Sequence, residues 1–478
     1  MDFPTDFIFS IRALLGDDTI PFLSSLTDDA SVGFRLNPFK AKRNPMEAVV
    51  SLEPVPWSRW GFYLNERPSF TFDPLFHAGY YYVQEASSMF IEHVVNELVT
   101  EPSVCLDLCA APGGKSVSLL PALPSGSLLV SNELIRQRAH VLSETMTKFG
   151  HPHVMVTNNR PLDFIHFPHF FDLILVDAPC SGEGMFRKDE TAIEEWSPQN
   201  VEMCAARQRD ILSDIWPALK PGGLLIYSTC TYNTSENEGN SLWIADELGA
   251  EFVSLKINEG WGISPSFDNR VTGYRFFPHR TKGEGLYVTV LRKGEGAAGE
   301  FSSGRLQTKN KKKSSPFVKD RSGYSNLLLQ PDLFEFMEED NRVIALPMAY
   351  SDNLISLNEH LKAVSIGIEM GEWKGKDFIP SHSLAVSSNI NPEVFIRREV
   401  VYEEAVSYLR REAIVLPDAP RGYLLLTYKG EPLGFVKNLG SRANNLYPNE
   451  WRIRSGYLSD KASEIFRPHL PHFQSSNP

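Results

Sequence analysis

Short apolar runs alternate with amphipathic segments through the middle of the chain. Runs with the length of buried strands lie at 104–108, 127–130, 154–157, 171–176 and 224–227. Between them, apolar positions recur at helical spacing from about residue 116, over 134–149 and over 199–219. Gly150 ends the second of these helices, and Pro221-Gly-Gly223 follows the third. Strands separated by helices predict an α/β fold with a doubly wound, Rossmann-like parallel sheet.

Elements are also expected outside this alternation. They are a helix over 84–98, a helix capped by Ser235 with Glu238 three residues on, and further strands at 252–255 and 286–291. Nearer the C-terminus, strand-like residues 422–428 and 433–437 flank a turn at 429–432. This hairpin predicts a small β-rich domain.

The chain has 478 residues, which is too many for one hydrophobic core and predicts two to four domains. We expect four segments, namely an N-terminal extension (1–79), an α/β domain (80–292), a basic flexible linker (293–316) and a C-terminal region (317–478). No apolar run approaches the roughly 20 residues that cross a bilayer, and the acidic start does not resemble a signal peptide. We therefore expect a cytoplasmic protein that does not enter a membrane.

The net charge of −12 does not indicate nucleic-acid binding by itself, but basic residues are concentrated in one stretch. Between Phe301 and Gln330 a single acid, Asp320, accompanies seven basic residues, which are Arg305, Lys309, Lys311, Lys312, Lys313, Lys319 and Arg321. A solvated linker and an arm that contacts phosphates both explain this run.

A glycine-rich turn between the first strand and its helix predicts a ligand site. It has neither the phosphate-loop nor the dinucleotide spacing, but glycines here let the backbone approach a ligand at a helix N-terminus. Glu133, nineteen residues after Gly114, is placed to accept two ribose hydroxyls, and Asp107 to hold the amino group of an amino-acid moiety. The candidate cofactor residues of the turn are Cys109, Ala110, Ala111, Pro112, Gly113, Gly114 and Lys115.

Two of the five cysteines follow neighbouring strands. Cys105, Cys109 and Cys204 are interpreted as inert buried thiols, and no cysteine or histidine spacing indicates a metal site. Cys180 and Cys230 each come directly after an apolar strand, and adjacent strands lie about 5 Å apart, so both thiols can face one cleft.

Two thiols beside a one-carbon donor indicate methyl transfer to carbon 5 of cytosine. A thiolate that adds to carbon 6 of the ring makes carbon 5 nucleophilic toward an electrophilic methyl group. The carbon 5 proton must then leave and the thiol must be expelled, which a second nearby group assists.

Three segments, 107–116, 177–184 and 227–231, resemble the signatures of Sun-type RNA (cytosine-5) methyltransferases. The resemblance extends over about residues 30–292 and implies a methyltransferase domain with S-adenosyl-L-methionine as cofactor. It implies that Cys230 is the nucleophile and that Cys180 assists product release. It also implies contacts of the target base with Asp177, Pro179 and Lys188, and makes Asp177 part of the cofactor site as well.

The resemblance continues into both ends of the chain. Arg35 and Asn37 match the N-terminal Arg-x-Asn element of the family, in the expected RNA-binding extension. Where the family commonly has Asp near the adenine, this chain has Asn159, whose amide can still accept a hydrogen bond. Residues 433–451 resemble the end of the F-type bacterial members, which carry a PUA-like RNA-binding domain there. The implied partner is RNA, namely 16S rRNA or the 30S subunit. Nothing in the chain demands a dimer, so we expect a monomer, and the cysteine and histidine spacings give no reason to expect a metal.

Other functions remain open at this point. Cys180, in its Pro-Cys context, is the nucleophile if the chain works as DNA cytosine-5 methyltransferases do. The same chemistry on tRNA is a further alternative, as is a non-catalytic RNA-binding protein of ribosome assembly. An amino-group methyltransferase is disfavoured, because the fourth strand ends in Asp177-Ala-Pro-Cys180 and not in Asn/Asp-Pro-Pro-aromatic.

Overall fold

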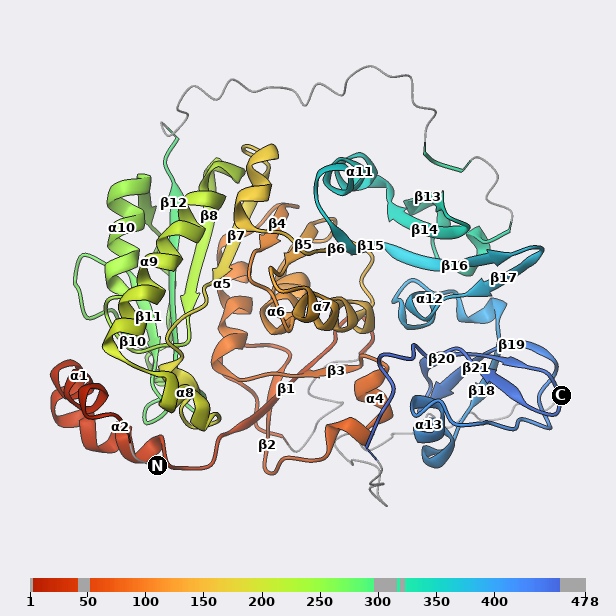
Figure 1. Cartoon of the computed structure of the whole chain (residues 1–478), viewed down its shortest axis with the longest axis horizontal. Coiled ribbons are helices and arrows are strands. Elements are labelled where there is room, and N and C mark those ends of the chain that lie inside the picture. Colours follow the sequence, from red (N-terminus) through yellow and green to blue (C-terminus); the bar gives the residue numbers. More distant parts are fainter. Residues whose placement is uncertain (1–2, 42–51, 296–315, 319–322, 456–478) are drawn as a thin grey trace.

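The computed structural model describes residues 3–41, 52–295, 316–318 and 323–455. In this part of the chain, a large mixed sheet with helices on both faces is joined to an N-terminal β-sheet and to a C-terminal β-rich region (Figure 1). The seven basic residues between 305 and 321 lie outside the described residues, so both interpretations of that run stay predictions. No described helix is long and apolar enough to cross a membrane.

The central sheet has a parallel core extended by antiparallel strands at both edges. Its strands in spatial order are β10 (Ser264–Pro265), β11 (Gly273–Phe276), β12 (Leu286–Lys293), β8 (Leu219–Thr229), β7 (Phe171–Asp177), β4 (Val104–Asp107), β5 (Leu128–Asn132), β6 (Val154–Thr157) and β15 (Ala363–Ile366), with β9 (Ala250–Phe252) beside β12. The strands from β8 to β6 are parallel. This confirms the Rossmann-like sheet predicted from the alternation.

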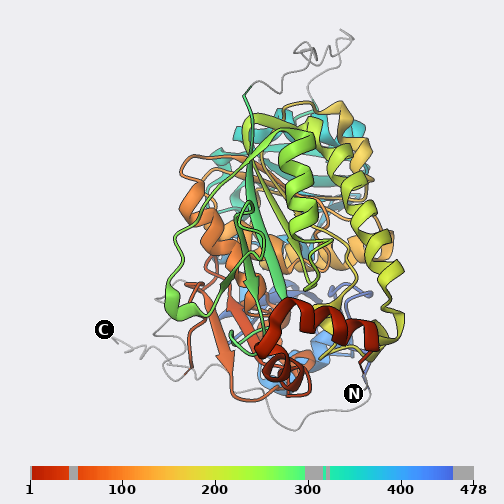
Figure 2. The ribbon, with the colours of Figure 1, turned by 90° about the vertical axis from the view of Figure 1, so that its left-hand side faces the viewer.

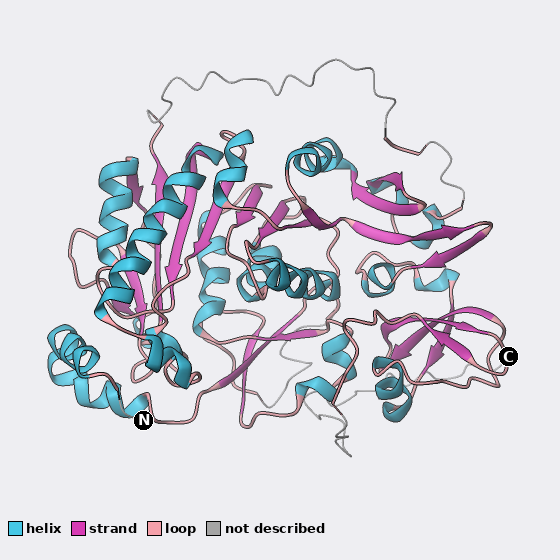
Figure 3. Ribbon diagram, viewed as in Figure 1, coloured by secondary structure: helices cyan, strands magenta, loops and turns pink. Residues whose placement is uncertain are grey.

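Helices cover both faces of this sheet, as its apolar strands require (Figures 2 and 3). One face packs against α5 (Phe90–Leu98), α6 (Gly114–Ala122) and α7 (Arg136–Phe149). The other packs against η4 (Pro161–His166), α9 (Pro198–Ile215), α10 (Glu238–Leu248) and α11 (Ser351–His360). Because both faces are buried, the loops beyond the carboxyl ends of the strands are where a ligand can reach the domain.

Two details of the expected elements are wrong. Ser235 does not cap α10, which follows Asn237, because residues 234–237 form a turn that buries the carboxylate of Glu236. The strand expected at 252–255 lies at Ala250–Phe252 instead, where it pairs with β12.

The described N-terminal residues form three α-helices and a small sheet against the central domain. These elements are α1 (Thr5–Leu15), α2 (Thr19–Ser25), α4 (Pro74–His77), β1 (Val32–Leu36), β2 (Gly61–Leu64) and β3 (Tyr81–Val83), with β1 in the middle of the sheet. The Arg-x-Asn element anchors this part. The Arg35 guanidinium is buried against the Glu92 carboxylate of α5 at 2.7 Å, and the Asn37 amide donates to the Phe149 carbonyl that ends α7 at 2.7 Å.

The described residues of the C-terminal region form two further four-stranded sheets. They are β13 (Phe334–Glu339), β14 (Arg342–Pro347), β16 (Ile368–Lys374) and β17 (Asp377–Pro380), then β18 (Ile396–Glu399), β19 (Gly422–Tyr428), β20 (Glu431–Asn438) and β21 (Ala443–Asn445). The expected hairpin is confirmed as β19 and β20. Two helices, α12 (His382–Val386) and α13 (Tyr402–Leu409), pack beside them.

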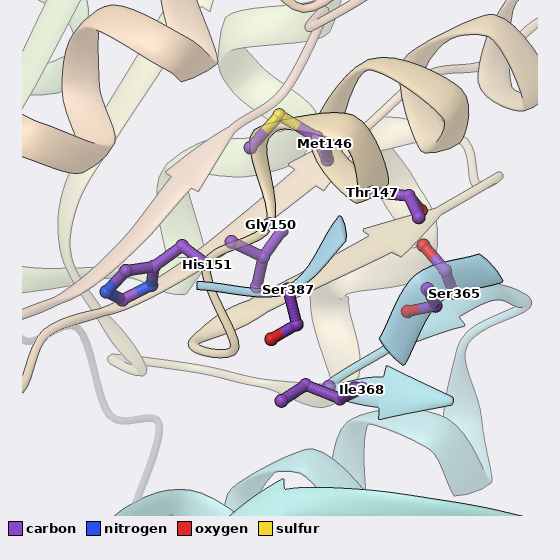
Figure 4. Close-up of a pocket in the computed structure, with 10 residues that line it drawn as sticks. Met146, Thr147, Gly150, His151, Ser365, Ile368 and Ser387 are labelled. Atoms are coloured by element: carbon purple, nitrogen blue, oxygen red, sulfur yellow. The ribbon is translucent and has the colours of Figure 1, made fainter. Parts of the chain in front are cut away.

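One strand of the C-terminal region leaves those sheets and completes the central one. β15 pairs antiparallel with β6, so residues 363–366 form an edge of the central sheet. Beside this junction a cavity of about 20 Å³ is lined from α7 by Met146 and from the C-terminal region by Ser365 and Ser387 (Figure 4). Next to this cavity the Ser388 N–H of the C-terminal region donates to the Gly150 carbonyl at 2.9 Å, so the two parts are in direct contact.

Candidate active site

The glycine-rich turn lies between β4 and α6, where the sequence predicts it. Gly113 precedes α6 with a left-handed φ of 117°, and a Cβ there would lie 2.8 Å from the Thr145 methyl group of α7. Glycine is therefore required both by the backbone conformation and by the close approach of α7. The turn brings backbone groups and the N-terminus of α6 to the carboxyl edge of the sheet, which suits an incoming ligand.

Asp107 lies at the end of β4 with one unpaired carboxylate oxygen. Its Oδ2 accepts from the Ser116 hydroxyl at 2.7 Å, whereas its buried Oδ1 has no hydrogen-bond partner among the described residues. Burial raises the pKa of Asp107 to about 7. A cationic ligand group would satisfy Oδ1, so the residue fits the amino group of S-adenosylmethionine.

Glu133 and Asn159 occupy the ends of the next two strands. Glu133 is buried, accepts from the Ile135 N–H at 2.9 Å and has the Arg138 guanidinium 3.5 Å away. The Asn159 amide donates to the Asp163 carboxylate at 3.3 Å, and its Oδ1 accepts from the Lys362 N–H of the C-terminal region at 2.9 Å. The amide oxygen expected at the adenine thus already has a donor, and C-terminal residues lie beside this end of the site.

Cys180 and Cys230 lie together, as the strand pattern predicts. β7 and β8 pair in parallel with Asp177 opposite Ser228, and the two cysteines follow in the next loops. Their Sγ atoms are 3.2 Å apart, and both side chains are partly buried. Cys105, Cys109 and Cys204 have raised pKa values because of burial, as expected for thiols without a chemical role.

The two thiols differ in their ionisation. A hydrogen bond from the Cys180 thiol, together with the Lys115 ammonium, lowers the pKa of Cys230 below its usual value despite burial and the Asp177 charge. The same hydrogen bond, together with burial, raises the pKa of Cys180 well above its usual value. The arrangement therefore favours a thiolate on Cys230 and a protonated Cys180.

Lys115 and Asp177 connect the glycine turn with the cysteines. The Lys115 ammonium lies 2.9 Å from the Asp177 carboxylate, whose other oxygen accepts from the Ser228 hydroxyl at 2.7 Å. Burial lowers the pKa of Lys115, but the Asp177 carboxylate outweighs it and the net pKa is raised. Both charges are thus held at the edge where the glycine-rich turn and the cysteine loops meet.

The remaining predicted base contacts lie on the Cys180 loop. Pro179 is exposed, and its carbonyl accepts from the Gln208 amide at 3.0 Å. The Lys188 ammonium lies 3.2 Å from the Glu284 carboxylate, which also pairs with Arg187. Sequence reasoning did not single out the buried Glu183 and Glu236, whose only sequence signal is a position within three to six residues of a cysteine.

Family models match three parts of the chain. The model for 16S rRNA methyltransferase RsmB/F matches residues 97–292, the N-terminal domain of 16S rRNA methyltransferase RsmF matches 3–86, and the methyltransferase RsmF PUA domain matches 398–453. Ribosomal RNA small subunit methyltransferase F of Escherichia coli O81 (strain ED1a) is 31% identical over 430 residues, covering 85% of this chain and 86% of that protein. The chain belongs to the ribosomal RNA small subunit methyltransferase F family.

Other comparisons agree with this family. The enzyme of the same name from Salmonella newport (strain SL254) is 29% identical over 480 residues, covering 95% of this chain and 98% of that protein. A methyltransferase homologue from Pyrococcus horikoshii has a similar fold, with a TM-score of 0.52, 26% identity, and coverage of 61% of this chain and 95% of that one. The NSun6 structure from the same organism, with SFG, has a TM-score of 0.52 and 20% identity over 61% of this chain and 98% of that one.

Membership of the methyltransferase F family confirms several predictions. The Sun-type resemblance, the Rossmann-like domain and the C-terminal PUA domain are confirmed, and the family consists of S-adenosylmethionine-dependent rRNA methyltransferases. A family of this kind, with a PUA RNA-binding domain, has RNA as its partner.

Proposed function

We propose that this chain transfers a methyl group to carbon 5 of a cytidine in 16S rRNA through a covalent Cys230 adduct. The observation that carries the proposal is the distance of 3.2 Å between the Cys180 and Cys230 Sγ atoms at the carboxyl edge of the sheet. Methyl transfer to a nitrogen or to an oxygen needs no thiol pair, whereas activation of carbon 5 needs a nucleophile and help with its release.

S-adenosyl-L-methionine would supply the electrophilic methyl group. The residues proposed to hold it are Asp107, Glu133, the turn at 109–115, and Asp177, with Asn159 at the adenine end. Asp107 supports this assignment, because its buried Oδ1 has no hydrogen-bond partner among the described residues and would accept from an ammonium group. The NSun6 neighbour was solved with SFG, an analogue of this cofactor, which supports the same class of ligand for the fold.

The protein's own groups then perform the base chemistry. The Cys230 thiolate adds to carbon 6 of cytosine and forms a C–S bond, which leaves carbon 5 nucleophilic. After carbon 5 is methylated, a base in the site takes its proton, the C–H electron pair restores the ring double bond, and the C–S bond breaks with its electron pair on sulfur, which returns Cys230 as a thiolate. Cys180, within hydrogen-bond reach of Cys230, assists this release, while Asp177, Pro179 and Lys188 contact the base.

The flanking modules are proposed to bind the RNA. We assign this role to the N-terminal extension, residues 1–79, and to the PUA domain within the C-terminal region, residues 317–478. Residues 293–316 would connect the two parts as a linker. The match of the chain to 16S rRNA methyltransferases supports 16S rRNA as the substrate.

Two cysteine variants test the mechanism. Cys230→Ala should abolish turnover and form no adduct, whereas Cys180→Ala should accumulate a protein–RNA adduct that survives denaturing electrophoresis. An adduct that forms in Cys230→Ala and disappears in Cys180→Ala would reverse the roles, as in DNA cytosine-5 methyltransferases. Full activity of Cys230→Ala would exclude covalent catalysis by this residue.

The substrate is tested with labelled S-adenosylmethionine on unmodified 30S subunits, naked 16S rRNA and tRNA in parallel, with the modified base mapped. Label at cytosine carbon 5 in either ribosomal substrate would support the proposal. Label in tRNA alone would indicate that tRNA is the substrate. No label in any of the three, combined with no cofactor binding by calorimetry, would favour a non-catalytic RNA-binding role.

A further inference from the structure

Glu183 is a buried carboxylate on the loop that follows Cys180, in η5 (Glu183–Met185), and it binds the loop that follows Cys230. Glu183 is only 2% exposed to solvent. Its Oε2 accepts from the backbone N–H groups of Tyr232 at 2.7 Å and Asn233 at 2.9 Å, and its Oε1 accepts from the Trp196 indole at 2.9 Å. Glu183 therefore holds the backbone two and three residues after Cys230.

Glu236 makes the reverse connection. It lies on the loop that follows Cys230, is fully buried, and its Oε2 accepts from the backbone N–H of Ser181 at 3.1 Å. The Gln208 amide of α9 donates to the same carboxylate at 2.6 Å and to the Pro179 carbonyl at 3.0 Å. The backbone on both sides of Cys180 is thus fixed to Glu236, directly and through Gln208.

The two carboxylates form a reciprocal pair, in which each cysteine loop supplies the acceptor for the backbone of the other. Neutral contacts add to it, since Ser181 Oγ and Thr231 Oγ1 are 2.9 Å apart and the Gly184 N–H donates to the Cys230 carbonyl at 2.9 Å. Neither Glu183 nor Glu236 forms an ion pair within the described residues, so backbone and side-chain N–H groups of neutral residues satisfy both.

We propose that Glu183 and Glu236 are positioning residues that hold the Cys180 and Cys230 loops in register, so that the two thiols remain in contact. The relevance of this contact to catalysis rests on the proposed function. Neither carboxylate is accessible enough to touch the RNA base, so both act through the cysteines.

The chemistry of the pair requires carboxylates. Each receives three or more N–H donors, and an ionised carboxylate offers only acceptors, whereas a glutamine amide would turn its own donors toward one of these N–H groups. An unsatisfied buried donor then remains, and the loop must move to reach another acceptor. Loss of the thiol contact would also remove the Cys180 hydrogen bond that lowers the pKa of Cys230, which gives a second measurable consequence.

The first experiment measures the thiol contact without RNA. Diamide accepts two electrons and two protons as two thiols become a disulfide, so its rate of closing a Cys180–Cys230 disulfide reports how often the Sγ atoms meet. We expect Glu183→Gln and Glu236→Gln to close this disulfide on the order of 10-fold more slowly than the wild type. Closure is followed by peptide mass spectrometry, with each protein at the pH that gives the same degree of Cys230 ionisation. Glu202→Gln, an exposed substitution on α9, is the matched control and should match the wild type.

The second experiment measures catalysis on the RNA. Misplacing a reacting group by about 1 Å costs on the order of 100-fold in rate, so kcat should fall by that factor while the KM for RNA stays within about threefold. In Glu183→Gln the alkylation midpoint of Cys230 should also move to higher pH, because the Cys180 hydrogen bond that lowers the pKa of Cys230 is weakened. A purely structural role would leave that midpoint unchanged.

If a glutamine variant does not fold, it is replaced by Thr231→Val, which keeps the side-chain shape and removes the hydroxyl contacts with Ser181 and with the Asn233 amide. It should slow disulfide closure by a smaller factor. Wild-type closure rates in folded Glu183→Gln, Glu236→Gln and Thr231→Val would overturn the proposal. If closure slows but no protein methylates cytosine, the positioning role stands and the proposed function fails.

Discussion

At the scale of single residues, the charges around Cys230 affect its ionisation. Lys115 lies close enough to lower the pKa of Cys230, and it also balances Asp177, whose charge acts in the opposite direction. Lys115→Met removes the favourable charge and leaves Asp177 uncompensated. Both changes disfavour the thiolate, so the pKa of Cys230 should rise.

This prediction is checked by the pH dependence of iodoacetamide alkylation at Cys230, followed by mass spectrometry. The alkylation midpoint of Lys115→Met should lie at least about one pH unit above that of the wild type. Lys220→Met serves as the control, because Lys220 pairs with Asp172 at the opposite end of β7. A midpoint that does not move in Lys115→Met would show that Cys180 alone lowers the pKa.

The positions of single residues could be predicted from the sequence when the residues directly follow a strand. Cys180 and Cys230 follow neighbouring strands, and their contact follows from that topology alone. The bonds of Glu183 and Glu236 depend instead on the path of two loops, which no hydrophobic period encodes. The amide oxygen of Asn159 was unpredictable for a related reason, because its donor, Lys362, is about two hundred residues away in the chain.

At the scale of elements, the two cysteine loops pack so closely that one position excludes a side chain. A Cβ on Gly184 would lie 2.9 Å from the carbonyl oxygens of both Cys230 and Gly285. Since both are backbone atoms, Gly184→Ala must displace a loop, at a cost of about 1–3 kcal/mol in unfolding free energy. Adduct formation at Cys230 should fall at the same time.

The matched control is Gly182→Ala. Gly182 has a left-handed φ of 75°, but nothing lies within 4 Å of its Cβ position. This variant should lose about 1–2 kcal/mol through backbone strain and keep its adduct rate. Urea unfolding and denaturing electrophoresis give the two quantities. A normal adduct rate in Gly184→Ala would mean that the loops shift to accommodate the methyl group without displacing Cys230.

The elements themselves were largely predictable. Buried parallel strands such as β4 and β7 are continuous apolar runs, and α7 has helical spacing and ends at Gly150, so their existence followed from the pattern. The prediction that a helix starts after Ser235 was wrong, because tertiary contacts outweigh the local capping pattern at this position. Here the burial of Glu236 against the Cys180 loop holds residues 234–237 in a turn.

At the scale of the whole molecule, two histidines are buried where the N-terminal part meets the C-terminal region. His77 of α4 lies 3.2 Å from the Tyr447 hydroxyl, and His382 of α12 packs against the Tyr447 and Trp451 rings. Burial, with the nearby Lys148 charge, lowers the pKa of each to about 3, and Lys40 adds to the effect on His382.

Stability should therefore depend on pH. Between pH 6.5 and about 3 the unfolded chain binds protons that the folded one excludes, so the free energy of unfolding falls as the pH falls. The slope is up to about 1.4 kcal/mol per pH unit for each histidine. Urea unfolding between pH 7 and 5 measures it. His382→Phe should reduce the slope, whereas His140→Phe, at an exposed position of α7, should not. Equal slopes in all three proteins would contradict the prediction.

The arrangement of the parts was not predictable from the pattern. Residues 363–366 have no feature that distinguishes a strand of the central sheet from a strand of the C-terminal sheets. Their position depends on pairing with β6, and on Asn158 and Asn159, which bond the backbone of Lys362. Contacts of this kind appear only when the complete chain is packed.

The position of β15 also has a consequence for how the protein is made. A ribosome synthesises β6 about two hundred residues before β15, at roughly 5–20 residues per second. During the intervening seconds the nascent sheet has β6 as an open edge, with unpaired N–H and C=O groups that another strand can recruit. The catalytic domain is therefore exposed to mispairing until residues 363–366 have been synthesised and can pair with β6.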